Sequence, residues 1–199
     1  MKSPDLIMIT GDLLNANEPD NHIAVTLLAE LSAIAPTYIS LGNHELEYEQ
    51  NYGTDITALY ESAGATVLNY EYKDITINSQ PLRIGGIYGY CLPDKYLETG
   101  EADPGECKFL WDFENTDRYK ILLSHLHGGQ VILPGIGGVY APDMGWFPGQ
   151  LKGIFDSEDG KRHLVLSSGL GNTELVPRFN NIPEIACVEL MPDGNLHKT

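Results

Sequence analysis

The stretch that decides the fold is Leu6-Ile7-Met8-Ile9-Thr10-Gly11-Asp12. Its first five residues form a continuous run without alternating charged positions, which predicts a strand buried on both faces of a sheet. Gly11 and Asp12 then mark a turn at the carboxyl end of that strand. The chain therefore opens with an interior strand, and a carboxylate stands at its end.

A helix and a second strand follow this turn. Asp20 or Asn21 can cap the helix, and Pro36 ends it. The second strand is Tyr38–Leu41. Strand, helix and strand in this order predict a right-handed βαβ unit with parallel strands. The apolar positions that recur at helical spacing are Ile23, Leu27, Leu31 and Ile34.

Polar residues follow the second strand as they follow the first. The sequence after Leu41 is Gly42-Asn43-His44-Glu45. Because the carboxyl ends of parallel strands open at one edge of a sheet, we expect Asp12, Asn43 and His44 to meet there. The alternatives are an ordinary turn at Gly11-Asp12 and a helix cap at Asn43.

A third polar segment follows the predicted strand Tyr119–Ser124. His125 and His127 lie two residues apart, so in extended backbone they point the same way, about 7 Å from each other. With the Asp12 carboxylate and the Asn43 amide they would form a mixed nitrogen and oxygen set that suits Mn, Fe, Zn or Co. Alternatively, the two histidines form a partly buried, hydrogen-bonded pair.

The rest of the chain is rich in strands. A helix that contains Ile56 and Tyr60 is expected to end at Gly64, and short strands are expected around 66–68, 70–77 and 82–84. Residues 91–117 predict loops around one short helix, and strands recur from 131 to 190. We expect an α/β protein with two packed sheets and helices outside, folded as a single domain over residues 1–199.

Composition excludes several classes of function. The net charge of −16 disfavours nucleic-acid binding and favours divalent cations. Three cysteines without CxxC spacing predict reduced thiols rather than a disulfide framework. The apolar run near Met1 is too short for a signal peptide or a membrane span, so the chain as sequenced is expected to be cytoplasmic.

Three blocks in this order resemble the signature of calcineurin-like metallophosphoesterases: Gly11-Asp12, Gly42-Asn43-His44-Glu45 and His125-Leu126-His127-Gly128-Gly129-Gln130. The resemblance implies a double β-sandwich flanked by helices and metal-dependent hydrolysis of phosphoesters. Residues 133–142, 169–172 and 177–184 resemble a bacterial subgroup of membrane-associated phosphodiesterases related to UDP-2,3-diacylglucosamine diphosphatases. That subgroup implies a lipid- or nucleotide-linked substrate and association with a membrane surface.

The resemblance also implies roles for single residues. Asp12 corresponds to the ligand that bridges two metals, Asn43 and His125 to ligands of the second metal, and His127 to a ligand of the first. His44 corresponds to the residue that donates a proton to the leaving oxygen or stabilises it. Arg178 and Asn172 are candidates for substrate binding, although a surface ion pair is an equally open role for Arg178.

The chain departs from the family pattern at two places. No strand ending in Asp-x-His precedes Leu6, and two family segments that carry histidines are fused in Leu122–His127. The first metal would keep only Asp12 and His127, which is fewer than the three or four ligands usual for a catalytic site. We therefore expect one metal or none where the family holds two, and an open sheet edge that favours a homodimer.

Three hypotheses follow from these patterns. The chain is a metal-dependent phosphodiesterase or phosphatase in which metal-activated hydroxide attacks phosphorus. Alternatively, it is a degenerate relative that binds a metal or a phosphorylated ligand without turnover. In the third hypothesis it is a fragment that a missing N-terminal segment or a partner chain completes, and its intact form is membrane-associated.

Overall fold

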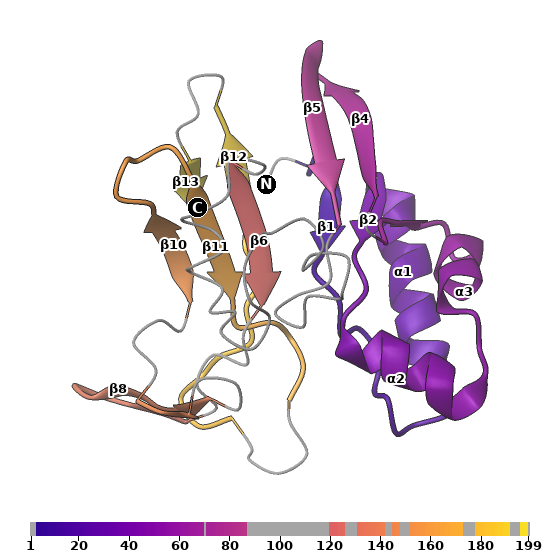
Figure 1. Cartoon of the computed structure of the whole chain (residues 1–199), viewed down its shortest axis with the longest axis horizontal. Helices are drawn as coiled ribbons and strands as arrows, with labels where there is room; N and C mark the ends of the chain where they lie inside the picture. Colours follow the sequence, from indigo (N-terminus) through magenta and orange to yellow (C-terminus); the bar gives the residue numbers. More distant parts are fainter. Residues whose placement is uncertain are drawn as a thin grey trace, which may run out of the picture. The chain divides into compact units, whose positions relative to one another are not determined.

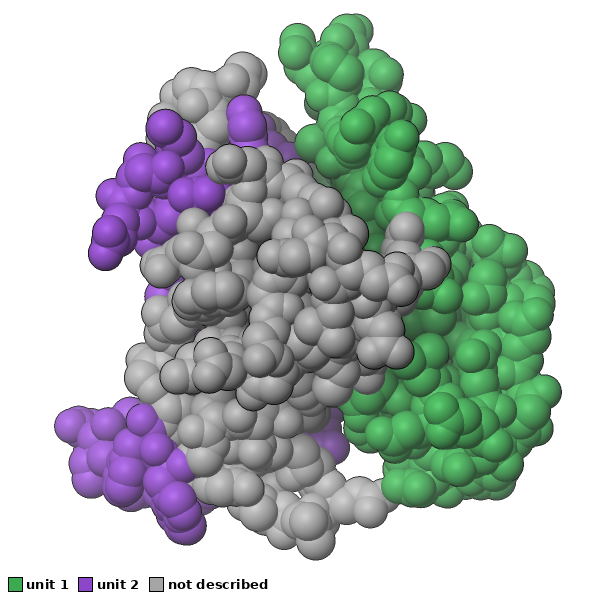
Figure 2. Space-filling model, viewed as in Figure 1, with its two compact units in different colours: residues 1–97 green, residues 98–199 purple. Residues whose placement is uncertain are grey.

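A computed structural model describes residues 3–69, 71–86, 120–125, 131–141, 145–147, 152–172, 178–191 and 196–198. The chain divides into two compact units, residues 1–97 and residues 98–199 (Figure 2). Both contain β-sheet and the first also contains helices, so the predicted α/β class is confirmed. The prediction of one domain over the whole chain stays a prediction.

The first unit is built on a parallel sheet. Its strands lie in the order β1 (Ile7–Ile9), β2 (Thr37–Ile39) and β3 (Thr66–Val67). Ile7 pairs with Thr37 and Tyr38 pairs with Thr66, both in parallel register, as the βαβ pattern predicted. The helices α1 (His22–Ile34), α2 (Asn43–Tyr52) and α3 (Ile56–Ser62) connect these strands (Figure 1).

Successive residues of each strand face opposite sides of this sheet. Ile9, Ile39 and Val67 pack in the cluster that the helices cover, which also holds Leu28 and Tyr60. The other face carries a second cluster together with the antiparallel hairpin of β4 (Tyr72–Ile77) and β5 (Gln80–Gly85). Its members are Leu6, Met8, Tyr38, Leu68, Ile75, Leu82 and Ile84. Apolar burial on both faces explains why the sequence of β1 does not alternate.

The predicted buried face of α1 is partly wrong. Ile23 is 79% exposed and Ile34 is 61% exposed, whereas Ala24 and Leu28 are buried. The helix sequence is apolar on nearly all sides, so spacing alone did not identify the face that packs on the sheet. The face that packs on the sheet contains Ala24 and Leu28, each one residue after a predicted position.

The second unit contains three small sheets in its described part. One has the order β10 (Gly153–Asp156), β11 (His163–Ser167) and β6 (Ile121–His125), with β6 parallel to β11. Leu164 and Leu166 on β11 form its buried centre with Leu122 and Phe155. The other sheets are β7–β8–β9 (Val131–Leu133, Gly137–Ala141 and Gly145–Trp146) and β12–β13 (Val188–Leu190 and Leu196–Lys198).

Some sequence predictions lie outside the described residues. These are the loops and helix of residues 91–117 and the position of His127. His125 is the last residue of β6, paired with Ser167, where the sequence placed it just after a strand. No helix in the described ranges is long and apolar enough to cross a membrane.

Candidate active site

Asp12 lies in the turn after β1, in the left-handed region of backbone conformation with a φ of 52°. Its carboxylate Oδ1 accepts a hydrogen bond from the backbone N–H of His44 over 3.1 Å. The two segments are therefore in direct contact, which confirms that the strand ends bring Asp12 and His44 together. The close approach of the two turns holds the non-glycine residue in this unfavourable conformation.

The Asp12 carboxylate replaces a helix cap. Gly42 is the N-cap residue of α2 and has no side chain that could accept a hydrogen bond from the first turn. His44 is the second helical residue, whose N–H is normally satisfied by an N-cap side chain. Asp12 supplies that acceptor from another segment, and the N-terminal end of the helix favours its negative charge.

Two glycines allow this contact. A Cβ on Gly11 would lie 2.6 Å from the backbone nitrogen of Gly42, and a Cβ on Gly42 would collide with the Asp12 carboxylate. Gly11 also has a φ of 97°, which L side chains rarely adopt. Glycine at both positions is therefore needed to place the carboxylate over the helix end.

The Glu45 carboxylate joins the two turns through hydrogen bonds. Its side chain is fully buried, and its Oε2 accepts hydrogen bonds from the N–H groups of Asp12 and Gly42, each over 2.8 Å. Its Oε1 accepts from the N–H of Leu13 over 2.8 Å and from the hydroxyl of Tyr60 over 2.9 Å. Four donors match the acceptor capacity of one carboxylate, so the buried charge is fully hydrogen-bonded.

Glu45 belongs to the Gly42-Asn43-His44-Glu45 motif, but the sequence alone indicated no role for it. The available signal was its place three residues after the N-cap Gly42, which is the acidic position of a capping box. The hydrogen bond from the Gly42 N–H to the Glu45 carboxylate is the half of the capping box that the acidic residue makes. The bonds to Asp12, Leu13 and Tyr60 depend on tertiary structure, and no local pattern predicts them.

His44 is oriented through one ring nitrogen. The backbone N–H of the buried Ala16 donates to His44 Nδ1 over 3.3 Å. Asn51 donates to the Ala16 carbonyl over 3.0 Å and fixes that segment from α2. An Nδ1 that accepts a hydrogen bond carries no proton, so the neutral ring bears its proton on Nε2. Nε2 is then the atom that can donate to a ligand.

Asn43 is the first residue of α2, next to His44. Its amide nitrogen donates to Glu47 over 3.4 Å, which leaves its amide oxygen as the atom that would bind a cation. The N-cap of this helix is Gly42, so the alternative prediction of Asn43 as the cap is wrong by one residue.

The donor set of the first unit fits a divalent cation in kind. Asp12 offers a carboxylate and Asn43 an amide oxygen, the ligand types that hard and borderline cations take. Within the ranges that the structure describes, no group of three His, Cys, Asp or Glu side chains could hold a metal ion. The described residues of this unit therefore offer two oxygen donors of a kind that a cation could bind. In the second unit, His125 is described at the end of β6 and is partly buried.

Arg178 and Asn172 contact each other in the second unit. The Arg178 backbone N–H donates to Asn172 Oδ1 over 3.2 Å. The Arg178 guanidinium donates to carbonyls of the chain, from Nη2 to Ser168 over 2.6 Å and from Nε to Gly171 over 2.7 Å. Its Nη1 is buried and has no hydrogen-bond partner among the described residues, and burial lowers the pKa of the guanidinium below its usual value.

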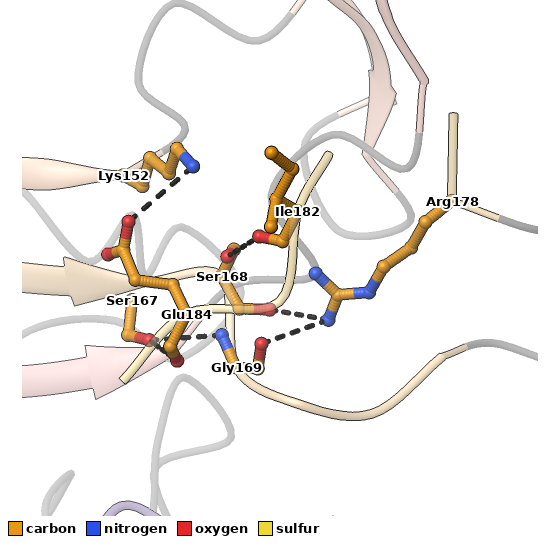
Figure 3. Close-up of polar contacts among 7 residues, drawn as sticks. All are labelled: Lys152, Ser167, Ser168, Gly169, Arg178, Ile182 and Glu184. Atoms are coloured by element: carbon orange, nitrogen blue, oxygen red, sulfur yellow. Dashed lines mark hydrogen bonds and ion pairs between the residues drawn. The ribbon is translucent and has the colours of Figure 1, made fainter. Parts of the chain in front are cut away.

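The Arg178 guanidinium donates hydrogen bonds to the carbonyls of Ser168 and Gly169 in the loop that follows β11 (Figure 3). Ser168 Oγ of this loop donates to the carbonyl of Ile182, and Ser167 Oγ at the end of β11 donates to that of Glu184, each over 3.1 Å. Arg178 therefore makes no ion pair among the described residues, and most of its donors serve the backbone. Its role in substrate binding, like that of Asn172, stays a prediction.

Comparison with known proteins gives this arrangement a family. The sequence model described as calcineurin-like phosphoesterase matches residues 1–150. Phosphodiesterase YaeI of Escherichia coli (strain K12) is 27% identical over 212 residues, which cover 96% of this chain and 72% of the relative. An uncharacterized metallophosphoesterase of Bacillus subtilis (strain 168), YkuE, is 29% identical over 201 residues, which cover 94% of this chain and 68% of the relative.

A putative metallophosphoesterase of Caenorhabditis elegans, F40B5.2, is 31% identical over 150 residues, which cover 64% of this chain and 31% of the relative. No solved structure matches the chain. The family match includes the two turns that carry Asp12 and His44. The chain belongs to the calcineurin-like phosphoesterase family and is a hydrolase that acts on phosphoester bonds.

Proposed function

We propose that this hydrolase is a metal-dependent phosphodiesterase whose site is built around the Asp12 turn and the N-terminus of α2. The observation that carries the proposal is the hydrogen bond between the Asp12 carboxylate and the His44 backbone N–H, because it brings the proposed cation ligand and the proposed leaving-group residue into contact. A phosphodiester substrate is supported by the name of the Escherichia coli relative. The family name of the relatives supports metal dependence.

The proposed ligands of the metal are Asp12, Asn43, His125 and His127. The first two are supported by their donor atoms at one helix end, and the histidines are supported by the sequence motif alone. When bound, a divalent ion supplies Lewis-acid activation of water and of the phosphoryl oxygens. Mn, Fe, Zn and Co all accept such a mixed set of ligands.

His44 serves the leaving group in this proposal. In the reaction, the oxygen of water bonds to phosphorus and releases one proton to solvent, the bond from phosphorus to the leaving oxygen breaks, and that oxygen takes up one proton from solvent. The Ala16 N–H donates to Nδ1, so the Nε2–H is the ring donor that is left for the leaving oxygen. This contact supports stabilisation of the leaving oxygen by the Nε2–H, rather than full transfer of its proton, as the main contribution of His44.

Finer parts of the proposal concern substrate and assembly. The tail segments that resemble membrane-associated phosphodiesterases support a lipid- or nucleotide-linked substrate and a protein that works at a membrane surface. In the described part of the first unit, β1 pairs with β2 alone and is an edge strand, which supports association of two chains through that edge. Sedimentation of the purified chain distinguishes a dimer from a monomer.

The second candidate function is ligand binding without turnover. It is favoured by the ligand set itself, because the described residues that gather at α2 provide two oxygen donors where catalytic sites use three or four ligands. One metal per chain with no hydrolysis would support this alternative. Two metals per chain with turnover would exclude it.

The test is hydrolysis by the reconstituted chain. The protein is stripped with a chelator, reloaded with Mn²⁺, and assayed on bis(p-nitrophenyl) phosphate and on p-nitrophenyl phosphate. The proposal predicts turnover that depends on the metal and is faster on the diester. Absence of hydrolysis of either compound by a folded chain that contains Mn²⁺ would contradict catalysis, and equal rates with and without Mn²⁺ would contradict metal dependence.

A further inference from the structure

We propose that Glu45 and Tyr60 are positioning residues of this site, which hold the Asp12 turn in place over the N-terminus of α2. The inference rests on the proposed function for its catalytic consequence. Its structural basis is independent of that function, since it concerns four hydrogen bonds onto one buried carboxylate.

The contact between the two turns is reciprocal. The Glu45 carboxylate accepts from the backbone of Asp12 and Leu13, while the Asp12 carboxylate accepts from the backbone of His44. Each acidic side chain thus satisfies donors of the segment that carries the other. Movement of the Asp12 turn away from the helix would break three hydrogen bonds at once.

The contact between the two turns holds Asp12 in a strained backbone conformation. Asp12 has a φ of 52°, and left-handed backbone is unfavourable at a residue other than glycine. The N–H of Asp12 is bound by Glu45 Oε2 while Asp12 is in this conformation. Without Glu45, the turn would relax and carry the Asp12 carboxylate away from His44.

Tyr60 gives Glu45 its fixed orientation. The tyrosine lies on α3, is fully buried, and donates its hydroxyl proton to Glu45 Oε1 over 2.9 Å. Burial and the neighbouring Glu45 charge raise the pKa of the Tyr60 hydroxyl far above its usual value. The hydroxyl therefore remains a donor throughout the pH range in which a protein is assayed, and Glu45 keeps one orientation.

Tyr60→Phe tests this role because the ring stays in the core and only the hydroxyl is lost. We expect kcat to fall about tenfold with KM near the wild-type value, and the affinity for Mn²⁺ to fall by a similar factor. We also expect faster hydrogen exchange at the N–H groups of Asp12 and Leu13. Exchange is measured on the protein without metal, so it is independent of activity.

Tyr48→Phe is the matched control. Tyr48 is a buried tyrosine on α2, and its hydroxyl donates to the carbonyl of Pro19 over 2.6 Å, away from the Asp12 turn. The variant loses the same atom and two hydrogen bonds, because Asn21 Nδ2 also donates to the Tyr48 hydroxyl over 3.3 Å, so it controls for the general cost of removing a tyrosine hydroxyl. We expect its kcat, its Mn²⁺ affinity and the exchange of Asp12 and Leu13 to match the wild type.

Glu45→Gln provides a second variant with a stronger effect. Glutamine keeps the shape of the side chain, but its NH₂ group faces backbone donors that need an acceptor. We expect a loss of kcat of about 100-fold, larger than that of Tyr60→Phe. Amide exchange should increase at Asp12, Leu13 and Gly42.

The outcomes separate this inference from the proposed function. If Tyr60→Phe and Tyr48→Phe differ neither in Asp12 and Leu13 exchange nor in Mn²⁺ affinity, Glu45 and Tyr60 stabilise the fold only and the positioning role is wrong. If the wild-type chain hydrolyses no phosphodiester, the proposed function fails, while amide exchange still decides whether the pair holds the turn.

Discussion

The Asp12 carboxylate accepts a hydrogen bond from the His44 N–H over 3.1 Å, so a residue from the end of β1 caps the helix that follows β2. This contact joins the two turns that a parallel sheet places at one edge. It also makes the helix cap and a proposed metal ligand the same side chain. Changes that disturb the cap should therefore affect stability and catalysis together.

Gly42→Ala should inactivate the site. Gly42 has a φ of −104°, which alanine adopts without strain, but the new Cβ would collide with the Asp12 carboxylate. Displacement of a reacting group by about 1 Å can lower a rate about 100-fold. We expect a loss of that order in kcat/KM in the assay of phosphodiester hydrolysis, with a folded far-UV circular dichroism spectrum.

Gly53→Ala at the other end of α2 is the control for this change. Gly53 has a φ of 65°, and a Cβ there would meet no atom within 4 Å. Alanine in this conformation should lower the free energy of unfolding by about 1 kcal/mol and leave kcat/KM unchanged. Full activity in Gly42→Ala would show that the position of Asp12 over the helix does not matter.

Two substitutions of His44 should separate its two nitrogens. Asparagine can place an oxygen near Nδ1 and keep the bond from Ala16, whereas glutamine can place an NH₂ group near Nε2. If the Nε2–H stabilises the leaving oxygen, His44→Gln should retain more activity than His44→Asn. The loss in His44→Asn should be about 100-fold or more.

The affinity for Mn²⁺ checks this interpretation of His44. Because His44 is not a proposed ligand, both variants should bind Mn²⁺ like the wild type in a calorimetric titration. A large loss of affinity in both would instead make His44 a ligand. Equal activity of the two variants would contradict the role of the Nε2–H.

Arg178→Lys should destabilise the second unit. The Arg178 guanidinium donates to the carbonyls of Ser168, Gly169 and Gly171, a planar fork that an ammonium group cannot reproduce. We expect the free energy of unfolding to fall by about 2 kcal/mol. Chemical denaturation measures this change, and a rise in KM alone would instead support substrate binding by Arg178.

Arg83→Lys is the matched substitution for comparison. Arg83 pairs with Asp74 on the exposed hairpin of β4 and β5, at 2.6 Å. An exposed ion pair contributes little, so we expect no measurable change in the free energy of unfolding. Equal destabilisation by both changes would mean that Arg178 does not fasten its loop more firmly than a surface pair.

The carboxyl of Asp159 should titrate below its usual range. Hydrogen bonds from the Ser157 hydroxyl over 2.6 Å and from the Lys161 N–H over 3.1 Å lower the pKa of Asp159. Because the pKa of Asp159 is lower in the folded state, its charged carboxylate stabilises the fold at pH values above the usual aspartate pKa. That contribution is lost as the pH falls through the native pKa.

Ser157→Ala removes the first cause of that shift. We expect the titration midpoint of Asp159, measured by NMR from the chemical shift of its carboxyl carbon, to move upward toward the usual aspartate pKa. An unchanged midpoint would mean that the Ser157 hydroxyl has no influence on the charge of Asp159.

The sequence predicted the parts of the fold that depend on local patterns. Buried strands with a helix between them predicted a parallel pair, and the right-handed crossover placed Asp12 near His44. The buried face of α1 was not predictable, because the helix is apolar nearly all round and only the sheet selects Ala24 and Leu28. Asn43 was a plausible N-cap residue. The N-cap is instead Gly42, because the carboxylate of Asp12, from a distant segment, accepts the hydrogen bond that an N-cap side chain would accept.

The candidate site shows the same division. Asp12, Asn43 and His44 stand in recognisable turns, so their residue types were informative before the structure was known. Glu45 was not, because its partners Asp12, Leu13 and Tyr60 come from other segments. The loop contacts of Arg178 were likewise hidden, since a guanidinium bound to backbone carbonyls leaves no pattern in sequence.

The most direct test of the central claim compares Asp12→Asn with Asp20→Asn. Asp20 also accepts a hydrogen bond at the start of a helix, from the His22 N–H over 2.9 Å, and asparagine caps helices about as well as aspartate. We expect Asp12→Asn to lose phosphodiester hydrolysis and most of its affinity for Mn²⁺, while Asp20→Asn keeps both. Wild-type hydrolysis and Mn²⁺ affinity in Asp12→Asn would contradict the central claim.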